Sequence, residues 1–276
     1  MKSAWRIIRQ FLLVVLCGIF LGVFIFAAYQ LYQTFHGYRV AQQQYDNLSQ
    51  QYVSEQPAAT PTPTPTPTPE ETPENDRPMT DDPTPEAVSG PISVDFNALL
   101  AQNSDVVGWI YSPNTVISYP VLKGSDNDYY LYHMIDGSAN ANGSIFMDYL
   151  CEGDLSQDNT LVYGHHMNNG SMFASIANYK YDGYLAEHPT LYYYTPTQNY
   201  RLDVFAMFVT DGNSDVYTIN FGSRGDFQNF IDRMRSRSNF DSPVQVTSDD
   251  HIMTLSTCSY EYDDARYVVL CKISPM

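Results

Sequence analysis

The residues best suited to covalent chemistry lie near the carboxyl terminus. The run Thr254-Leu255-Ser256-Thr257-Cys258 is followed eight residues later by Arg266. A thiol must lose its proton before it attacks a carbonyl carbon, and a neighbouring cation lowers the pKa of the thiol. An arginine in the same place can also donate hydrogen bonds to an oxyanion as it forms. The pair therefore makes Cys258 a candidate nucleophile, although a cysteine and an arginine at this spacing are a weak motif by themselves.

A second group of candidate residues is the run Tyr163-Gly164-His165-His166-Met167. Imidazole is the side chain best suited to move protons near neutral pH. Neighbouring residues on a strand point to opposite faces, so only one of the two histidines can serve a given cleft. The residues alone do not say which, and a solvated surface histidine is the simpler alternative for either.

A metal site is not expected. Zinc requires several His, Cys or carboxylate ligands at helical or CxxC spacing. The other histidines show no such spacing: His36, His133, His188 and His251. We therefore predict an enzyme that needs neither a metal nor another cofactor.

Strand patterns surround both groups of candidate residues. Segments rich in β-branched and aromatic residues, separated by Gly, Asn or Asp, predict eight strands at 107–111, 116–122, 144–149, 160–166, 191–194, 200–209, 251–256 and 266–273. Helical patterns are fewer and cover 93–103, 127–133, 171–179 and 225–237. Two antiparallel strands joined by a loop can place Cys258 beside Arg266. The predicted fold is a mostly-β domain, a closed or nearly closed barrel with helical insertions.

The amino-terminal region is typical of a membrane anchor. Three cationic residues (Lys2, Arg6 and Arg9) precede an uncharged apolar run. We predict a cytoplasmic segment at residues 1–10 and a transmembrane signal-anchor helix at 11–32. A cleavable signal peptide is the alternative, but its apolar region would be shorter and a small-x-small site should follow it. The single-pass topology places the rest of the chain outside the cell membrane.

Two segments separate the predicted membrane helix from the predicted domain. Residues 33–56 are polar and Gln-rich, and we expect a stalk there. Residues 57–91 repeat Thr-Pro and are rich in Glu and Asp, a composition that opposes helix and sheet and favours extended chain. We expect this linker to be disordered and to act as a spacer that holds a catalytic domain, residues 92–276, away from the membrane.

Charge and cysteine usage restrict the partners further. The formal net charge is −17, so the chain offers little to neutralise phosphates and a nucleic-acid partner is not expected. Of the four cysteines, Cys17 lies in the apolar run and Cys271 in an apolar strand pattern. A disulfide between Cys151 and Cys271 is conceivable. Cys258 then remains as a free thiol outside the membrane.

Together, the pentapeptide ending at Cys258, the downstream Arg266 and the segment 163–167 resemble the sortase family. Further blocks resemble its class B: residues 103–110, 117–121, 126–131, 143–149 and the helical insertion at 225–240. The resemblance extends over residues 93–274. It implies a sortase-like closed eight-stranded β-barrel with helical insertions, preceded by the transmembrane helix.

The resemblance also implies a reaction. Cys258 would attack the carbonyl after threonine in a sorting signal near the carboxyl terminus of a surface protein, giving a thioacyl enzyme. His165, directly after the glycine, matches the family's general acid and base, and Arg266 matches the arginine that stabilises the oxyanion. An amine of a peptidoglycan precursor or cross-bridge would then take the acyl group.

Three further positions match residues that contact substrate in class B. Asn127 and Leu131 match positions that line its groove, and Ser256 matches the serine two before the cysteine. The simpler alternatives are a helix cap for Asn127 and core packing for Leu131. Ser259 departs from some class B members, which carry an acidic residue after the cysteine.

Three other functions stay open at this stage. A cysteine hydrolase on the same scaffold would use the same three residues but let water resolve the acyl enzyme. A sortase that polymerises pilins is another, although the blocks resemble class B. A non-enzymatic adhesion module on a stalk would need no reactive thiol at all.

Overall fold

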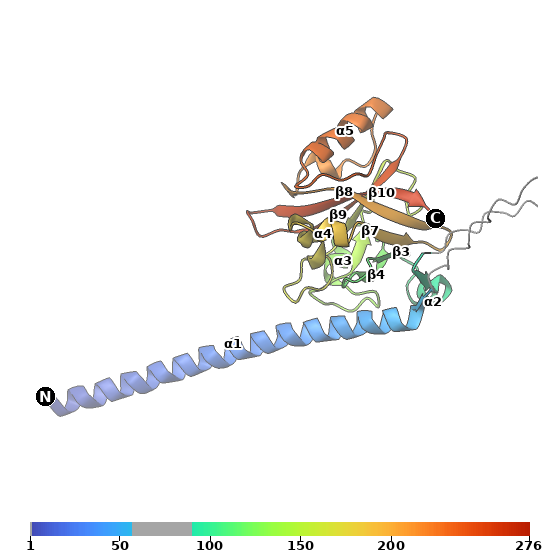
Figure 1. Ribbon diagram of the computed structural model, residues 1–276. Helices are drawn as coiled ribbons and strands as arrows, with labels where there is room; N and C mark the ends of the chain where they lie inside the picture. Colours follow the sequence, from blue (N-terminus) through green and yellow to red (C-terminus); the bar gives the residue numbers. More distant parts are fainter. Residues whose placement is uncertain (1, 57–89) are drawn as a thin grey trace, which may run out of the picture.

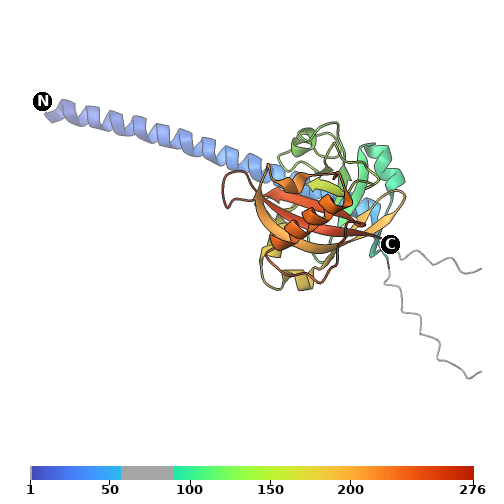
Figure 2. The same ribbon diagram turned by 90° about the horizontal axis from the view of Figure 1, so that it is seen from above.

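The computed structural model describes residues 2–56 and 90–276, and its chain is drawn in Figures 1 and 2. Eight strands close into a barrel in the order β10-β8-β7-β3-β4-β5-β6-β9. Their bounds are β3 Val106–Tyr111, β4 Ser118–Leu122, β5 Ile145–Met147, β6 Asn159–Tyr163, β7 Thr190–Tyr194, β8 Asn199–Asp211, β9 His251–Cys258 and β10 Ala265–Pro275. The predicted eight-stranded closed barrel with helical insertions is confirmed.

The pairing of β9 with its two neighbours brings the candidate residues to one rim of the barrel. The strand β9 pairs with β10 in antiparallel fashion, and Cys258 lies directly opposite Arg266. On its other side β9 is parallel to β6, with Tyr163 opposite Ser256. Parallel neighbours end at the same edge of a sheet. The residues that follow Tyr163 therefore lie at the rim where Cys258 ends β9.

Several element boundaries differ from the sequence prediction. The strand predicted at 160–166 ends at Tyr163, so both histidines lie just beyond it. Their positions are set instead by a hydrogen bond from Phe173 N to His165 O, 3.0 Å long, and by a bridge between His166 and Met172. The strand predicted at 144–149 ends at Met147, because Cys151 N turns back to donate to Asp148 O.

Three of the four predicted helical segments are shorter or tighter than predicted, and the fourth, at 225–237, is confirmed to within one residue at each end. The segment 93–103 begins as a strand, β2 (Ile92–Val94), and α2 (Phe96–Gln102) starts after Asp95, whose carboxylate accepts from Ala98 N. The segment 171–179 is a 3-10 helix, η1 (Ala174–Lys180). The remaining helical elements are α3 Tyr129–Tyr132, α4 Tyr184–Glu187, η2 Asp215–Tyr217 and α5 Arg224–Ser236.

Two apolar clusters hold the domain together. The first fills the barrel and includes Trp109, Val162 and Leu255, all fully buried. The second lies beneath α5 and joins the apolar face of that helix to side chains of β8, β9 and β10. Its members on α5 are Phe227, Phe230, Ile231 and Met234, and those on the strands include Phe205, Ile252 and Val268. Figure 1 shows α5 lying across this side of the barrel. The stripe on α5 recurs at three- and four-residue spacing, which is why this segment is helical.

The amino-terminal helix is much longer than the apolar run that it contains. The helix α1 extends over Lys2–Tyr52, and it is apolar enough over part of its length to cross a membrane, with a mean hydropathy of 3.0. Figures 1 and 2 show it leaving the barrel as one rod. The segment predicted as a polar stalk is helical up to Tyr52, and four side chains on one face of it are buried on the domain: Ala41, Tyr45, Leu48 and Tyr52.

The chain segments before and after the Thr-Pro repeats are paired with each other. The strand β1 (Val53–Glu55) is antiparallel to β2, and Gln56 N donates to Pro91 O over 2.9 Å. Most of the linker predicted at 57–91 lies outside the described residues. Its expected role as a spacer does not agree with this arrangement. The residues at its two ends are bonded to each other, and α1 already packs on the barrel before the linker begins.

Candidate active site

One cavity of about 470 Å³ at the rim of the barrel is lined by all six residues that the family resemblance assigned to catalysis or substrate contact. Its lining is Asn127, Leu131, Tyr132, Phe146, Tyr163, Gly164, His165, Gly212, Tyr217, Ser256, Thr257, Cys258 and Arg266. The cavity is open on one side and mixes apolar walls with a few polar groups, which is typical of a site for a small ligand or a peptide segment.

Cys258 is the last residue of β9, and its thiol is half-buried. The backbone after it returns at once to β10, with Ser259 N donating to Ala265 O over 2.8 Å. This short connection keeps Arg266 across the ladder from Cys258. The strand end thus holds the thiol by its backbone on one side and exposes it to the cavity on the other.

The guanidinium of Arg266 is held at two points. One nitrogen forms an ion pair with the Asp264 carboxylate at 2.8 Å, and the other donates to Ala265 O at 3.0 Å. A guanidinium has five N–H groups, so these two contacts leave others free to donate into the cavity. Its side chain is 30% exposed, which keeps the charge partly shielded from water. The arrangement suits a donor to an oxyanion that forms beside Cys258.

The two adjacent histidines have separate surroundings. His165 lines the cavity with Cys258, and its Nε2 lies 2.8 Å from the carbonyl oxygen of Leu131. A carbonyl oxygen only accepts, so Nε2 carries the proton and Nδ1 is the nitrogen left for proton transfer. His166 lines a different cavity, and its Nδ1 lies 2.9 Å from Cys258 O. The structure brings His165, rather than His166, to the cavity that Cys258 lines.

Asn127 is fixed at both ends of its amide. Its Nδ2 donates to Asp148 Oδ2 over 2.8 Å, and its Oδ1 accepts from Tyr149 N over 3.1 Å. The alternative role of a helix cap does not apply, because the carboxylate of Asp126 accepts from the backbone N–H groups at the start of α3. Asn127 is therefore a rigid polar group on the cavity wall.

Leu131 and Ser256 contribute in different ways. The Leu131 side chain is half-buried against the first apolar cluster, so core packing is part of its role, and its carbonyl is the acceptor for His165. Sequence reasoning missed the carbonyl, because a backbone oxygen leaves no mark in the residue pattern. Ser256 is buried, and its Oγ lies 3.0 Å from the hydroxyl oxygen of Tyr217.

Three residues with polar contacts in or behind the cavity wall were not predicted from the sequence. Tyr163 donates to Asp148 Oδ2 over 2.9 Å, and burial raises the pKa of Tyr163 well above its ordinary value. Burial likewise raises the pKa of Tyr217, so both phenols stay protonated. Tyr163 and Asp148 lie inside segments that carry the family resemblance, 163–167 and 143–149. Tyr217 lies in a segment with no periodic pattern, so no sequence signal marked it.

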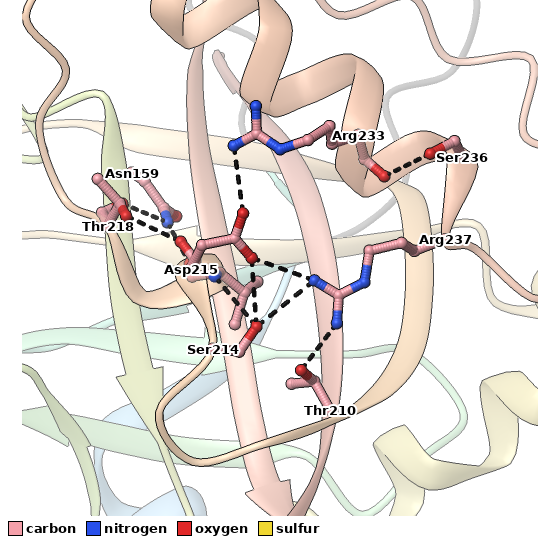
Figure 3. A network of polar contacts seen from close by, with 9 residues as sticks. Asn159, Thr210, Ser214, Asp215, Thr218, Arg233, Ser236 and Arg237 are labelled. Carbon is pink, nitrogen blue, oxygen red and sulfur yellow. Dashed lines mark hydrogen bonds and ion pairs between the residues drawn. The ribbon is translucent and has the colours of Figure 1, made fainter.

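A network of ion pairs holds the segment that carries Tyr217 (Figure 3). The carboxylate of Asp215 lies 3.2 Å from guanidinium nitrogens of both Arg233 and Arg237. Arg237 also donates to the hydroxyl of Thr210 on β8 over 2.8 Å. On the inner side, Asn159 Nδ2 donates to the carbonyls of Val216 and Thr218, each at 3.0 Å. Ion pairs from the α5 region and hydrogen bonds from the barrel thus hold η2 on two sides.

The remaining cysteines are unsuited to catalysis. Cys151 and Cys271 are both buried and free, so the conceivable disulfide between them is not formed. Burial raises the pKa of Cys151 to about 11 and raises that of Cys271 further. Within residues 2–56 and 90–276, no group of three or more His, Cys, Asp or Glu side chains is arranged to hold a metal ion.

Comparison with known proteins agrees with this geometry. Residues 110–274 match the sortase domain family. The chain is 32% identical over 270 residues to a sortase B of Listeria monocytogenes, covering 96% of this chain and 98% of that protein. It is 35% identical over 180 residues to a sortase B of Staphylococcus aureus, covering 64% of this chain and 74% of that protein.

Solved structures show the same likeness. A substrate complex of S. aureus sortase B aligns with a TM-score of 0.63 at 34% identity, over 66% of this chain and 85% of that one. A sortase B of Bacillus anthracis aligns with a TM-score of 0.69 at 28% identity, over 88% of this chain and all of that one (100%).

Proposed function

The chain belongs to the sortase family, in its class B, and we propose that it cleaves a carboxyl-terminal sorting signal after threonine and joins the protein to an amine of peptidoglycan. Sortases of this class are cysteine transpeptidases that anchor proteins to the cell wall. The observation that carries the proposal is the single cavity lined by Cys258, His165 and Arg266. The two half-reactions follow from the positions of these three side chains.

Cys258 acts first. Its thiol gives its proton to Nδ1 of His165, the thiolate attacks the carbonyl carbon of the threonine residue, and the electron pair of the carbonyl moves to oxygen. The free N–H groups of Arg266 stabilise this oxyanion. The C–N bond then breaks, and the leaving amine takes a proton from His165. The threonine acyl group remains on sulfur as a thioester.

The second half-reaction reverses these proton movements. An acceptor amine attacks the thioester carbon and gives up a proton to Nδ1 of His165. The C–S bond breaks, the sulfur leaves as thiolate, and a new amide bond joins the two substrates. The hydrogen bond from His165 Nε2 to Leu131 O keeps the ring in one tautomer through both steps.

The cavity walls supply recognition. Asn127 presents a fixed amide, Leu131 an apolar surface, and Ser256 contacts the Tyr217 hydroxyl. We expect these groups to contact the residues that precede the scissile bond. Substrates are surface proteins that carry a sorting signal, and the second substrate is a peptidoglycan precursor or a cross-bridge amine.

The position in the cell follows from α1. Its apolar stretch crosses the membrane once, and the cationic residues near the start, Arg6 and Arg9, keep the amino terminus in the cytoplasm. The barrel then lies outside the cell, where sorting signals and peptidoglycan precursors are both present.

Product analysis tests the reaction. The full chain in detergent micelles is incubated with peptides varied around a Pro-x-Thr core, with and without an added amine, and the products are read by mass spectrometry. We expect the threonine acyl product joined to the amine, and at least about a thousandfold loss of rate in Cys258→Ala. Free acid as the sole product in both mixtures would indicate a hydrolase. Unchanged anchoring in cells that carry Cys258→Ala would contradict an enzymatic role.

Thiol reactivity tests the nucleophile independently of any substrate. At pH 8 a thiol such as Cys151, with its pKa near 11, is only about one part in a thousand thiolate. A membrane-impermeant alkylating probe should therefore label Cys258 at least about a hundredfold faster than Cys151 or Cys271. The Cys258→Ala chain gives the background. Equal labelling of the three positions would favour a non-enzymatic module.

A further inference from the structure

The helix α1 is buried on the domain through one face, which carries Tyr45. On that face Tyr45 is only 3% exposed, and its ring meets the ring of Tyr119 edge-on, with centroids 5.2 Å apart. Apolar packing explains the ring, but a buried hydroxyl also requires a hydrogen-bond partner. The partner of this hydroxyl shows which part of the barrel Tyr45 holds in place.

The hydroxyl of Tyr45 donates to the carbonyl of Gly143 over 2.6 Å. Gly143 has a φ of +53°, and any side chain there would collide with the carbonyls of Tyr130 and Leu131. Its backbone is therefore in direct contact with those two peptide groups. Next to it, Ser144 N donates to Tyr130 O over 2.8 Å, which ties the two backbone segments together.

The Leu131 carbonyl is the group that holds His165 Nε2. A continuous series of contacts thus runs from the Tyr45 hydroxyl through Gly143 to Leu131 and the imidazole. A second contact of α1 acts on the same loop, since Asn140 Nδ2 donates to Gly37 O over 3.2 Å. The ring of Tyr45 supports the other side of the site, because Tyr119 accepts from Met172 N, next to the Phe173 N–H that binds His165 O.

We propose that Tyr45, on the helix that leads to the membrane, is a positioning residue for the acid–base histidine of the transpeptidation reaction. The inference rests on the proposed role of His165 and extends it to α1. A histidine that must transfer a proton in two successive steps depends on a fixed ring orientation, and small misplacements of a catalytic group lower the rate strongly. The helix α1 then helps to position a catalytic group and also attaches the enzyme to the membrane.

The test compares two tyrosine-to-phenylalanine changes on α1. Tyr45→Phe keeps the ring on Tyr119 and removes only the hydroxyl, which donates to Gly143 O and lies 3.2 Å from Ser144 Oγ. The matched control is Tyr52→Phe on the same face, whose hydroxyl donates to Gln102 Oε1 over 3.1 Å, away from the loop that carries Leu131. Both full chains are purified in detergent micelles, and their active sites are counted with the thiol probe.

We expect kcat per titrated site to fall about fivefold or more in Tyr45→Phe with KM nearly unchanged, because the loss affects proton transfer rather than peptide binding. Tyr52→Phe should keep kcat within about twofold of wild type, even if both variants melt at a similarly lowered temperature. Equal kcat in the two variants overturns the positioning role. A rise in KM alone in Tyr45→Phe also overturns it.

The experiment also distinguishes failure of the proposed function from failure of the Tyr45→Phe chain to fold. If the unmodified chain forms no amine-dependent product, the proposed function fails first and the inference falls with it. If Tyr45→Phe does not fold, Asn140→Ala releases the same loop from Gly37 O and should show the same selective loss of kcat. Wild-type kcat in a folded Asn140→Ala chain would then contradict the proposal.

Discussion

The two walls of the active-site cavity differ in how much of their support is exposed to solvent. The wall formed by Asn127 and Leu131, here the α3 wall, rests on Asp148, whose side chain is 5% exposed and accepts from Asn127 and Tyr163. A second wall, formed by Gly212 and Tyr217 and here called the η2 wall, is held on its inner side by the buried Asn159 amide and on its outer side by the Asp215 carboxylate. That carboxylate is 49% exposed and is bound by two arginines of the α5 region.

The difference indicates how each wall behaves when a peptide binds. Hydrogen bonds inside a protein are strong and directional, and breaking one leaves a buried polar group without a partner. Ion pairs on the surface contribute little and are weakened by salt. We therefore expect the α3 wall, which also orients His165, to be fixed, and the η2 wall, whose outer attachment through Asp215 is exposed, to adapt more readily to the substrate.

The largest effect should come from breaking the support of the α3 wall. Asp148→Ala leaves the Asn127 amide and the Tyr163 hydroxyl without their acceptor, so the free energy of unfolding should fall by about 3 kcal/mol. KM for the sorting peptide should rise because Asn127 is no longer fixed. Chemical denaturation and steady-state kinetics on the full chain measure the two effects.

A conservative variant is the control for that change. Both donors share Asp148 Oδ2, so the amide oxygen of Asp148→Asn can still accept from them, but its NH2 group then faces the Leu150 N–H that Oδ1 accepts from. This variant should therefore lose about half as much stability. If Asp148→Ala is as stable as wild type and binds peptide equally well, the α3 wall is not held by this carboxylate and the comparison between the walls fails.

The parts of the molecule that sequence reasoning reached are those with a periodic or paired pattern. The barrel followed from alternating strands with short connections, and the placement of Cys258 beside Arg266 followed from two adjacent antiparallel strands. The choice of His165 over His166 came from the family resemblance, since the pattern alone left both open. Its catalytic role, like those of Cys258 and Arg266, stays a prediction until kinetics are measured.

The parts that sequence reasoning missed depend on backbone groups or on contacts between distant segments. The Leu131 carbonyl holds His165, yet no residue type encodes a carbonyl. The face of α1 at 41, 45, 48 and 52 has helical spacing, but its apolar residues are few among glutamines, so a solvated stalk was the natural expectation. Tyr217 lies on a three-residue 3-10 helix, which is too short to show any periodicity.

The smallest expected effect comes from a change in the η2 wall, and it is the most direct test of the difference between the two walls. Asp215→Asn removes the negative charge that two exposed arginines share, so stability should change by less than about 1 kcal/mol. KM should rise about twofold at low ionic strength, because Tyr217 is held less firmly over Ser256. In about 1 M salt, where the screening length is near 3 Å, wild type and variant should converge. Peptide kinetics across a salt series measure this.

The matched control for Asp215→Asn is Asp232→Asn. Asp232 is also exposed and lies on α5, but its carboxylate accepts only from the Gln228 side chain, at 3.0 Å, among the described residues. The control changes the net charge by the same amount without touching η2, so its KM should follow wild type at every salt concentration. If the two variants respond identically, the effect belongs to overall charge. If Asp215→Asn instead costs as much stability as Asp148→Ala, the η2 wall is as rigid as the α3 wall, and substrate adaptation must be sought elsewhere in the cavity.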